Sequence, residues 1–401
     1  MNHTSITSTT FDVIIIGGGP SGSSAAIRLS RQGHSVLVVD QHSFPRAKTC
    51  GDFYTPSVIS LIEEIGLIDS FEESNPHKIN NFRVRILDSS VGFDLDIGSI
   101  NPRFYSFVQP RYDFDSQLLH HARVCGTQFM KATFRAPIIK DGKVIGVRVS
   151  NENQEIELFS KILIGADGSK STVTSKLDRT RVKSRDKAIA IRGYLDEIEV
   201  TPGTIEVFIS KDIFPGYGWI FPNGKKSANI GICFLLTNSN NKIHNIKQSF
   251  YSFINSPIIK SRIAKNYKLR DLKTATINLG MNRKIKRVFN GAILIGDAAC
   301  LANPIHGGGI CNGMTSGLIA AEEIDLALRS ETCSISLLKG YESRIEKELL
   351  SELQHSKIAH YIAYFSPHLL KVLIWLISKN QFLPWLANQL YKDVKTKIKP
   401  L

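Results

Sequence analysis

The first forty residues contain the pattern that most restricts how this chain can fold. An apolar run over residues 11–16 leads into a glycine-rich segment, GGGPSG at 17–22, and a second apolar run after a helix-like stretch ends at Asp40. A GxGxxG motif between a strand and a helix, with an acid at the end of the next strand, is typical of dinucleotide-binding βαβ units. We therefore expect a Rossmann-like α/β domain that binds a dinucleotide.

Residues of this motif have distinct expected roles at the pyrophosphate. Gly17 permits the tight turn, Gly19 lets backbone N–H groups approach the phosphates, and Gly22 allows the helix to pack closely on the strand. Pro20 and Ser21 lie in the first helical turn, where the partial positive charge of the helix N-terminus attracts phosphate. The acid that ends the second strand can accept hydrogen bonds from a ribose. The alternative is a glycine-rich turn that serves packing alone.

A second motif, almost three hundred residues later, indicates which dinucleotide binds. The apolar run over 291–295 ends in Gly296-Asp297, and a glycine-rich turn then opens a helix-like segment from 311 to about 328. A flavin dinucleotide needs such a distant partner, because its ribityl chain must be held between the pyrophosphate and the isoalloxazine. Asp297 can bond the ribityl hydroxyls, and the turn can direct N–H groups at the flavin pyrimidine edge. The turn residues expected to contact the flavin are Pro304, Gly307, Gly308, Gly309 and Ile310. We predict FAD as the cofactor.

The composition is that of a globular chain with an unusual charge. The 401 residues are 42% hydrophobic and 21% charged, which suffices for a large core. The net charge of +14 favours phosphorylated or carboxylated substrates, an acidic partner protein or an anionic membrane surface. Scattered Lys and Arg are equally typical of a solvated basic surface. No recognition motif accompanies the charge, so nucleic acid is not expected as a partner.

Cysteine usage and apolar runs indicate the compartment. Six cysteines without CxxC or metal-ligand spacing predict reduced thiols and no metal site. We expect no signal peptide in the short, polar residues 1–10, and no apolar run is long enough to span a bilayer. These features favour a cytoplasmic protein. The aromatic, basic tail over 360–401 favours either a cap on the substrate cavity or peripheral contact with anionic lipid.

Apolar patterning predicts interleaved domains. A third buried strand ends in a turn containing Asp167 and Gly168, and much of 180–275 alternates polar and apolar residues, as in an antiparallel sheet with one buried face. We expect an FAD-binding domain from residues 10–75, 103–178 and 276–330, a substrate-binding β-sheet domain from 76–102 and 180–275, and a C-terminal helical segment over 331–401.

Over about residues 11–330 the chain resembles the flavoprotein group that contains aromatic hydroxylases, flavin-dependent halogenases and geranylgeranyl reductases. GxGxxG, GADG at 165–168, and Gly296-Asp297 with Pro304 are similar to three fingerprints of that group. RAKTCG at 46–51 is similar to the Arg-x-Lys-x-Cys-Gly segment of geranylgeranyl reductases. YGWIFP at 217–222, followed after eight residues by GIC, resembles their Tyr-x-Trp-x-Phe-Pro…Gly-x-Gly substrate-cavity signature. The departure is Cys233, where the family has glycine.

The resemblance implies a p-hydroxybenzoate hydroxylase-like fold with an inserted, mostly antiparallel sheet. It also adds residues at the cofactor: Arg46, Lys48, Cys50 and Gly51. Tryptophan halogenases carry Trp-x-Trp-x-Ile-Pro and a lysine in a Lys-x-Gly-Glu segment, which this chain lacks, so Lys48 is expected to contact a phosphate or solvent. Arg111, at the start of a predicted helix, is expected to reach an FAD phosphate or ribose, or to form a surface ion pair with Asp113 or Asp115.

Reduction of an isolated alkene requires a hydride from reduced flavin and a proton for the other carbon, inside a dry apolar slot. The expected substrate-binding residues are Tyr217, Trp219, Phe221 and Gly231, although aromatic residues at this spacing also form ordinary core. The catalytic candidates are Cys50, Tyr217 and His306. Cys50 donates a proton or shapes the cavity, unless it is a buried inert thiol. His306 contacts substrate or flavin, unless it only satisfies a local hydrogen bond.

We therefore predict an FAD-dependent oxidoreductase that resembles geranylgeranyl reductases and reduces C=C bonds of an apolar isoprenoid-like substrate. The alternatives are a monooxygenase that uses a flavin C4a-hydroperoxide, a flavin oxidase or dehydrogenase acting on an aromatic or polycyclic secondary metabolite, and a flavoprotein that only binds or senses. No second nucleotide-binding unit is visible, so the expected electron donor is transiently bound NAD(P)H, reduced ferredoxin or free reduced flavin.

Overall fold

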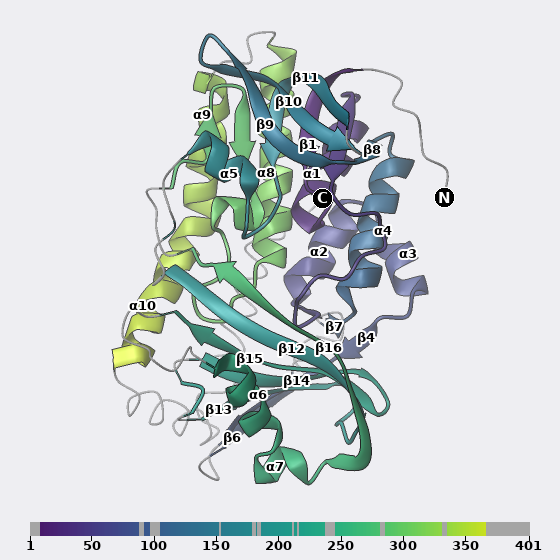
Figure 1. Ribbon diagram of the computed structural model, residues 1–401, viewed down its shortest axis with the longest axis vertical. Coiled ribbons are helices and arrows are strands. Elements are labelled where there is room, and N and C mark those ends of the chain that lie inside the picture. The colour runs from purple at the N-terminus through teal and green to yellow at the C-terminus, as the bar shows by residue number, and fades with distance from the viewer. Residues whose placement is uncertain are drawn as a thin grey trace.

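The computed structural model describes residues 9–365, apart from 88–91, 97–104, 152–153, 179–181, 183–185, 211, 215, 237–244, 281–284 and 331–334. In the view of Figure 1, a sheet flanked by helices occupies the upper half and a second sheet occupies the lower half. The helix α10 (Ser351–Phe365) runs down one side from the first half toward the second. This is the two-part architecture predicted from the apolar patterning, with an inserted sheet and C-terminal helices.

The upper sheet is built from the apolar strands. Its members are β1 (Thr10–Ile16), β2 (Val36–Asp40), β8 (Gln128–Lys131), β9 (Thr133–Lys140), β10 (Lys143–Asn151), β11 (Gln154–Gly165), β17 (Val288–Phe289) and β18 (Ala292–Leu294). The order is β17-β18-β11-β1-β2-β8, and β1 pairs in parallel with both β2 and β11. Strands β1, β2 and β18 and the end of β11 are almost completely buried, which explains their near-continuous Val, Ile and Leu. The carboxyl ends of β1, β2, β11 and β18 therefore meet at one edge, where the site lies.

The lower sheet has seven strands. They are β5 (Asn81–Ile86), β6 (Gly92–Asp96), β12 (Lys187–Ile198), β13 (Thr204–Ile209), β14 (Gly216–Gly224), β15 (Ser227–Leu235) and β16 (Ile263–Asn278). In the order β16-β12-β15-β14-β13-β5-β6, all pairs are antiparallel except β13 with β5. Alternate residues of β14 face opposite sides. Ile220 packs in the cluster with Phe250 and Phe253 of helix α6 (Ile246–Ile254), whereas Trp219 and Phe221 belong to the cluster on the other face.

A small third sheet and the remaining helices complete the described structure. The sheet has the order β3 (Phe53–Tyr54), β7 (Ser106–Val108), β4 (His77–Ile79), so residues 77–79, which patterning placed with the substrate sheet, pair with β7. The helices are α1 (Pro20–Arg31), α2 (Pro56–Glu64), α3 (Ile68–Glu73), α4 (Arg111–Val124), α5 (Thr172–Leu177), α7 (Pro257–Lys260), α8 (Ile310–Arg329) and α9 (Ile335–Ile345). A 3₁₀ turn spans Gly296–Ala299.

The C-terminal helices pack on the cofactor half. Leu338, Tyr341 and Ile345 of α9 are fully buried, and the Tyr341 hydroxyl donates to the carbonyl oxygen of Leu294 at 2.9 Å. A π-helical turn, Glu346–Leu350, connects α9 to α10. Residues 366–401, which hold most of the aromatic, basic tail, lie outside the described residues. Within the described chain, none of the helices has both the length and the apolarity to cross a bilayer.

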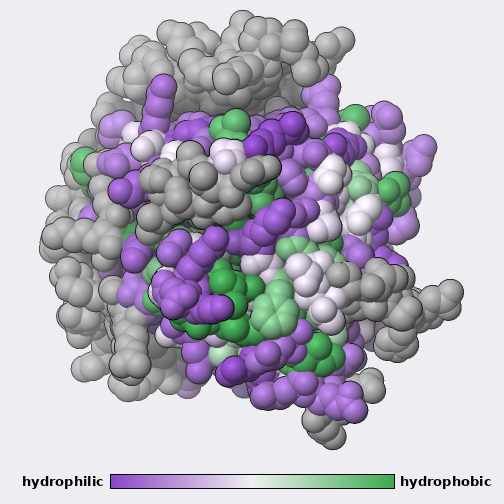
Figure 2. Space-filling view, turned by 90° about the horizontal axis from the view of Figure 1, so that it is seen from above, coloured by the Kyte–Doolittle hydropathy of each residue, from purple (hydrophilic) through white to green (hydrophobic). Residues whose placement is uncertain are grey.

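The surface seen from above carries mostly hydrophilic side chains, with apolar ones in limited patches (Figure 2). Patches of this kind are usual on globular proteins and indicate no particular partner. Most of the large apolar side chains of the described residues lie in three buried clusters, within the upper half, within the lower sheet and between the two.

Helix α1 approaches α8 and the 3₁₀ turn through glycines. A Cβ on Gly313 would lie 2.4 Å from Ser21 Oγ, and one on Gly317 would lie 2.4 Å from the Ser21 carbonyl oxygen. Gly296 has a φ of 58°, and a Cβ there would lie 2.3 Å from Ser21 Oγ. Gly317 permits the closest approach of backbone, whereas a Cβ on Gly296 or Gly313 would force the Ser21 hydroxyl to move. The two motifs assigned from sequence to one cofactor are therefore adjacent.

We expect Gly317→Ala to destabilise the protein by about 1–2 kcal/mol, although alanine favours helices by roughly 1 kcal/mol over glycine. The reason is that the new methyl group would meet backbone of α1. Gly340→Ala in α9 is the matched control, because its neighbour there is the flexible end of Glu323, which can move aside. Chemical denaturation of both variants checks the expectation. Equal stability of the two would contradict the backbone contact.

Candidate active site

The connection from β1 to α1 forms the first turn of the site. Gly17 has a φ of 110°, and a Cβ on Gly22 would lie 2.0 Å from the Gly17 carbonyl oxygen, so both positions require glycine. The Gly18 N–H donates to Asp40 Oδ2 at 2.9 Å, and the His42 N–H donates to Oδ1 at 2.9 Å. Asp40 thus braces the turn. A hydrogen bond from a ribose to Asp40 stays a prediction. It would use the lone pairs of the carboxylate that these two N–H groups leave unoccupied.

Two guanidinium groups face the N-terminus of α1. The nearest neighbours of a Cβ on Gly19, the N-cap residue, would be Arg46 Nη2 at 3.5 Å and Arg111 Nη2 at 3.8 Å. Buried Asp115 accepts from Arg111 Nε at 2.5 Å and Nη2 at 2.7 Å, and Arg46 Nη1 lies 3.1 Å from Asp115 Oδ2. The ion pair of Arg111 with Asp115 therefore exists, but it is buried and does not lie on the surface. Two cations beside a helix N-terminus suit a pyrophosphate.

Asp297 extends from the 3₁₀ turn toward the same region. Burial raises the pKa of its carboxyl, while the charges of Lys48 and Arg111 lower it, and no donor among the described residues is bonded to this carboxylate. Burial and the charge of Arg111 lower the pKa of Lys48, whereas Asp297 raises it. Asp297 is half-buried, so its carboxylate is open to hydrogen-bonding hydroxyls, which a ribityl chain supplies. The residues present therefore fit FAD.

The second glycine-rich turn lies beside Asp297. A Cβ on Gly309 would lie 2.6 Å from Asp297 Oδ1, and Gly309 is the N-cap residue of α8, which begins at Ile310. The N-terminus of this 20-residue helix therefore opens beside the carboxylate and contributes partial positive charge there. Pro304 is buried in the same turn, and Gly307 has a φ of 65°.

Asp167 is bonded to protein rather than free for a ligand. Its carboxylate accepts from the Ser171 hydroxyl and from the N–H groups of Thr172 at 2.7 Å and Val173 at 3.1 Å, at the N-terminus of α5. A Cβ on Gly168 would meet nothing within 4 Å, so this turn borders open space. A cofactor contact of Asp167 and Gly168 stays a prediction.

An aromatic wall lies on β14. Tyr217, Trp219 and Phe221 follow one another on one face, with adjacent ring centroids 5.9 Å apart. Trp219 lies over Gly231, where a Cβ would come within 2.2 Å of the indole. Phe53 adds a ring 5.4 Å from Phe221. The cluster around the wall is apolar; its other buried members are Ile79, Val108, Ala188, Ala190, Ile205, Cys233 and Leu279.

Tyr217 and His306 connect the wall to the glycine turn. The Tyr217 hydroxyl donates to the His306 carbonyl oxygen at 2.6 Å. The His306 ring is reached by solvent, yet surrounding protein lowers its pKa, so the ring is neutral at pH 7. Its Nδ1 accepts from the Gly308 N–H at 3.1 Å, which assigns the ring proton to Nε2. The local hydrogen bond considered from sequence is therefore present.

Cys50 lies between the wall and the arginines. A Cβ on the neighbouring Gly51 would be 3.0 Å from the Phe221 ring, so this loop rests on the wall. Burial, and then the charge of Asp52, raise the pKa of the Cys50 thiol, although the Arg111 side chain and the Asp52 N–H donate to its sulfur. The thiol is therefore protonated at neutral pH.

Sequence reasoning missed a polar cluster behind the wall. Buried Asp52 accepts from the Tyr194 hydroxyl at 2.6 Å and from Asn229 Nδ2 at 2.8 Å, and Trp219 Nε1 donates to Asn229 Oδ1 at 3.0 Å. Arg192, only 2% exposed, donates to the Lys48 carbonyl oxygen at 3.4 Å. The one available signal was an acid directly after the Cys-Gly motif, since Tyr194 and Asn229 lie on strands more than 140 residues away.

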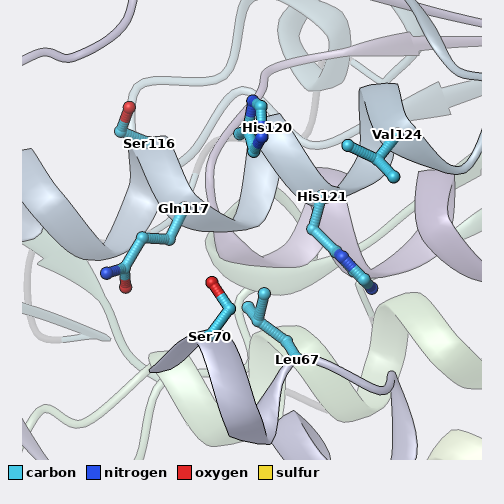
Figure 3. Close-up of a pocket in the computed structure, with 7 residues that line it drawn as sticks. All are labelled: Leu67, Ser70, Ser116, Gln117, His120, His121 and Val124. Carbon is cyan, nitrogen blue, oxygen red and sulfur yellow. The ribbon is translucent and has the colours of Figure 1, made fainter. Parts of the chain in front are cut away.

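A hollow of about 340 Å³ lies elsewhere, between α4 and the region of α3 (Figure 3). Its lining residues are Leu67, Ser70, Ser116, Gln117, His120, His121 and Val124. His121 Nε2 lies 3.0 Å from the carbonyl oxygen of Ile65, within hydrogen-bond distance. The hollow contains none of the predicted site residues, and we assign it no role.

Comparison with known proteins identifies the family of the chain. The chain matches the FAD binding domain family over residues 10–348. It is 30% identical over 329 residues to menaquinone reductase of Mycolicibacterium smegmatis, covering 78% of this chain and 75% of that protein. It is 27% identical over 385 residues to digeranylgeranylglycerophospholipid reductase of Thermoplasma volcanium, covering 92% of each.

Solved structures share the fold. A geranylgeranyl bacteriochlorophyll reductase-like protein from Thermoplasma acidophilum superposes with a TM-score of 0.84 at 24% identity, covering 92% of each chain. A myxobacterial chondrochloren halogenase follows with a TM-score of 0.74 at 22% identity, covering 84% of this chain and 80% of that one. The chain belongs to the FAD-binding domain family, as an FAD-dependent oxidoreductase of the geranylgeranyl reductase type.

Proposed function

We propose that this protein reduces C=C bonds of an apolar, isoprenoid-like substrate. The observation that carries the proposal is the position of the aromatic wall, which meets the cofactor-side residues at the Cys50–Gly51 loop and at the bond from Tyr217 to His306. An apolar chain against Trp219 and Phe221 would lie beside the cofactor without needing a polar anchor. Both relatives described above are named as reductases, which favours reduction over oxygen transfer.

The cofactor contacts follow from the charges and the turns. Arg46 and Arg111 would hold the pyrophosphate at the N-terminus of α1, and Asp297 would accept from ribityl hydroxyls. The N-terminus of α8 would face the flavin pyrimidine edge, where it stabilises negative charge. Bound FAD supplies the hydride. Lys48, beside Asp297 and Arg111, would add a positive charge that offsets the negative charge of the cofactor phosphates.

The chain's own residues would supply the proton. Cys50 holds a proton on Sγ at neutral pH because burial and the charge of Asp52 raise the thiol pKa, and the Arg111 side chain orients the sulfur. Tyr217 is the weaker candidate, because its hydroxyl is already bonded to the His306 carbonyl. Through this hydrogen bond, Tyr217 would hold the glycine turn against the aromatic wall and exclude water from between them.

The electron donor and the source of substrate belong to the same proposal. The net charge of +14 supports an acidic electron-transfer protein such as a ferredoxin, with NAD(P)H as the small-molecule alternative. An apolar lipid substrate supports peripheral membrane contact through the aromatic, basic C-terminal tail, most of which lies outside the described residues.

We expect Asp297→Asn to weaken FAD binding by about tenfold, because hydrogen bonds to a charged acceptor are roughly twice as strong as neutral ones. Titration of apoprotein with FAD, followed by flavin fluorescence, measures the affinity. Asp141→Asn makes the same chemical change in the exposed turn between β9 and β10 and should leave the affinity unchanged. Equal affinities of the two variants would remove Asp297 from the cofactor site.

Turnover without oxygen tests the reaction class. Reduced enzyme mixed anaerobically with geranylgeranyl diphosphate should reoxidise its flavin faster than without substrate, and mass spectrometry should find two added hydrogens per double bond. A product that forms only in air and gains oxygen would show a monooxygenase instead.

The reaction of Cys50 with alkylating reagents should begin at a higher pH than that of an ordinary thiol. Alkylating reagents react with the thiolate, so a raised pKa displaces the rate profile of Cys50 above that of an ordinary thiol. Iodoacetamide labelling across pH, with peptide mapping, gives the profile, and the unfolded chain in denaturant provides the reference. A midpoint for native Cys50 at or below that reference would contradict a protonated thiol at neutral pH.

A further inference from the structure

We propose that Asp52 is a positioning residue that couples the aromatic wall to the arginine grip on the FAD phosphates. Asp52 is fully buried and has a φ of 62°, a left-handed conformation that residues other than glycine rarely adopt. Its hydrogen-bond partners among the described residues do not include Tyr217, Trp219, Phe221 or the 17–22 turn. Its hydrogen bonds nevertheless extend to both sides.

On one side, Asp52 acts on the wall. Its Oδ2 accepts from the Tyr194 hydroxyl at 2.6 Å and from Asn229 Nδ2 at 2.8 Å. The same Asn229 amide donates to the Cys50 carbonyl oxygen at 2.8 Å, and its Oδ1 accepts from Trp219 Nε1 at 3.0 Å. The orientation of the Asn229 amide is therefore fixed by Asp52, and that amide in turn fixes the indole of Trp219.

On the other side, Asp52 acts on the start of α4. Its Oδ1 accepts from the Arg111 N–H at 3.3 Å, and its carbonyl oxygen accepts from the Gln109 N–H at 3.0 Å. Arg111 is the first residue of α4 and directs its guanidinium toward Gly19. One residue thus holds the helix start that carries the phosphate-facing arginine.

The surroundings of Asp52 make the arrangement specific. The side chain is completely removed from water, so its carboxylate depends on the donors from β12, β15 and α4 and on the nearby charge of Arg192. A buried polar network fixes one arrangement of its side chains when every donor and acceptor is paired. Removal of one member destabilises the fold, because it leaves a buried polar group unpaired. Loss of one hydrogen bond on the wall side should therefore be felt at the arginine side.

The test is a double-mutant cycle read as FAD affinity of the apoprotein. Tyr194→Phe removes only the hydroxyl and keeps the ring that stacks on Arg192 at 4.5 Å. Tyr194 has no predicted cofactor contact. We nevertheless expect Tyr194→Phe to weaken FAD binding by about fivefold, which is the lower end of the usual coupling between sites. Tyr105→Phe is the matched control, because that hydroxyl also donates to a carboxylate, Glu72, at 2.7 Å, but on the surface.

The cycle is completed with Asp52→Asn, which we expect to weaken FAD binding by about tenfold or more. In that background Tyr194→Phe should have no further effect, because its route through Asp52 is already broken. Multiplying effects would overturn the proposal, and so would an unchanged affinity for Tyr194→Phe. If Asp52→Asn does not fold, the comparison of Tyr194→Phe with Tyr105→Phe decides alone. This measurement uses no substrate. A negative result in the reductase assay would therefore not change the interpretation of the double-mutant cycle.

Discussion

The contact of Ser21 with three glycines is the constraint on which the site depends. Ser21 lies in the first turn of α1, and a Cβ on Gly296, Gly313 or Gly317 would come within 2.4 Å of a Ser21 atom. Because of this contact, two motifs almost three hundred residues apart, which the sequence assigns to one cofactor, lie side by side. A methyl group at position 317 would meet the backbone of α1 and would push the two helices apart.

Charge is arranged around the cofactor region in a consistent way. Arg46 and Arg111 share the buried Asp115, which holds the direction of both guanidinium groups. Buried ion pairs contribute little net stability, because desolvation offsets their attraction. Their value in this chain is geometric: they keep positive groups directed at the helix N-terminus before any anion arrives. This preorganisation is what a tightly held dinucleotide requires.

Much of the fold could be predicted from the sequence, because the signals were local. The buried strands of the upper sheet read as uninterrupted Val and Ile runs, and the alternation along β14 indicated one apolar face. GxGxxG and Gly296-Asp297 are short motifs with a strand before them. The Asp52 cluster could not be predicted in this way. Its members Tyr194 and Asn229 carry no motif, and only the folded lower sheet brings them to the Cys50 loop.

Asp40 and Asp167 show a second limit. Both were assigned to the cofactor from position at strand ends, yet both carboxylates are bonded to backbone N–H groups of neighbouring turns. Position in a motif does not reveal how many lone pairs the protein itself occupies. The same holds for Arg111, whose buried partner Asp115 lies one helical turn away and looked from sequence like a surface contact.

The glycine beneath Trp219 has a consequence for how the substrate range of this enzyme can change over evolutionary time. A methyl group at position 231 would come within 2.2 Å of the indole, and one at position 51 within 3.0 Å of the Phe221 ring. The rings themselves tolerate exchange for other apolar groups of similar volume. Under the proposed function, new specificities are therefore more accessible through exchange of the aromatic residues of the wall than through substitution of Gly231 or Gly51.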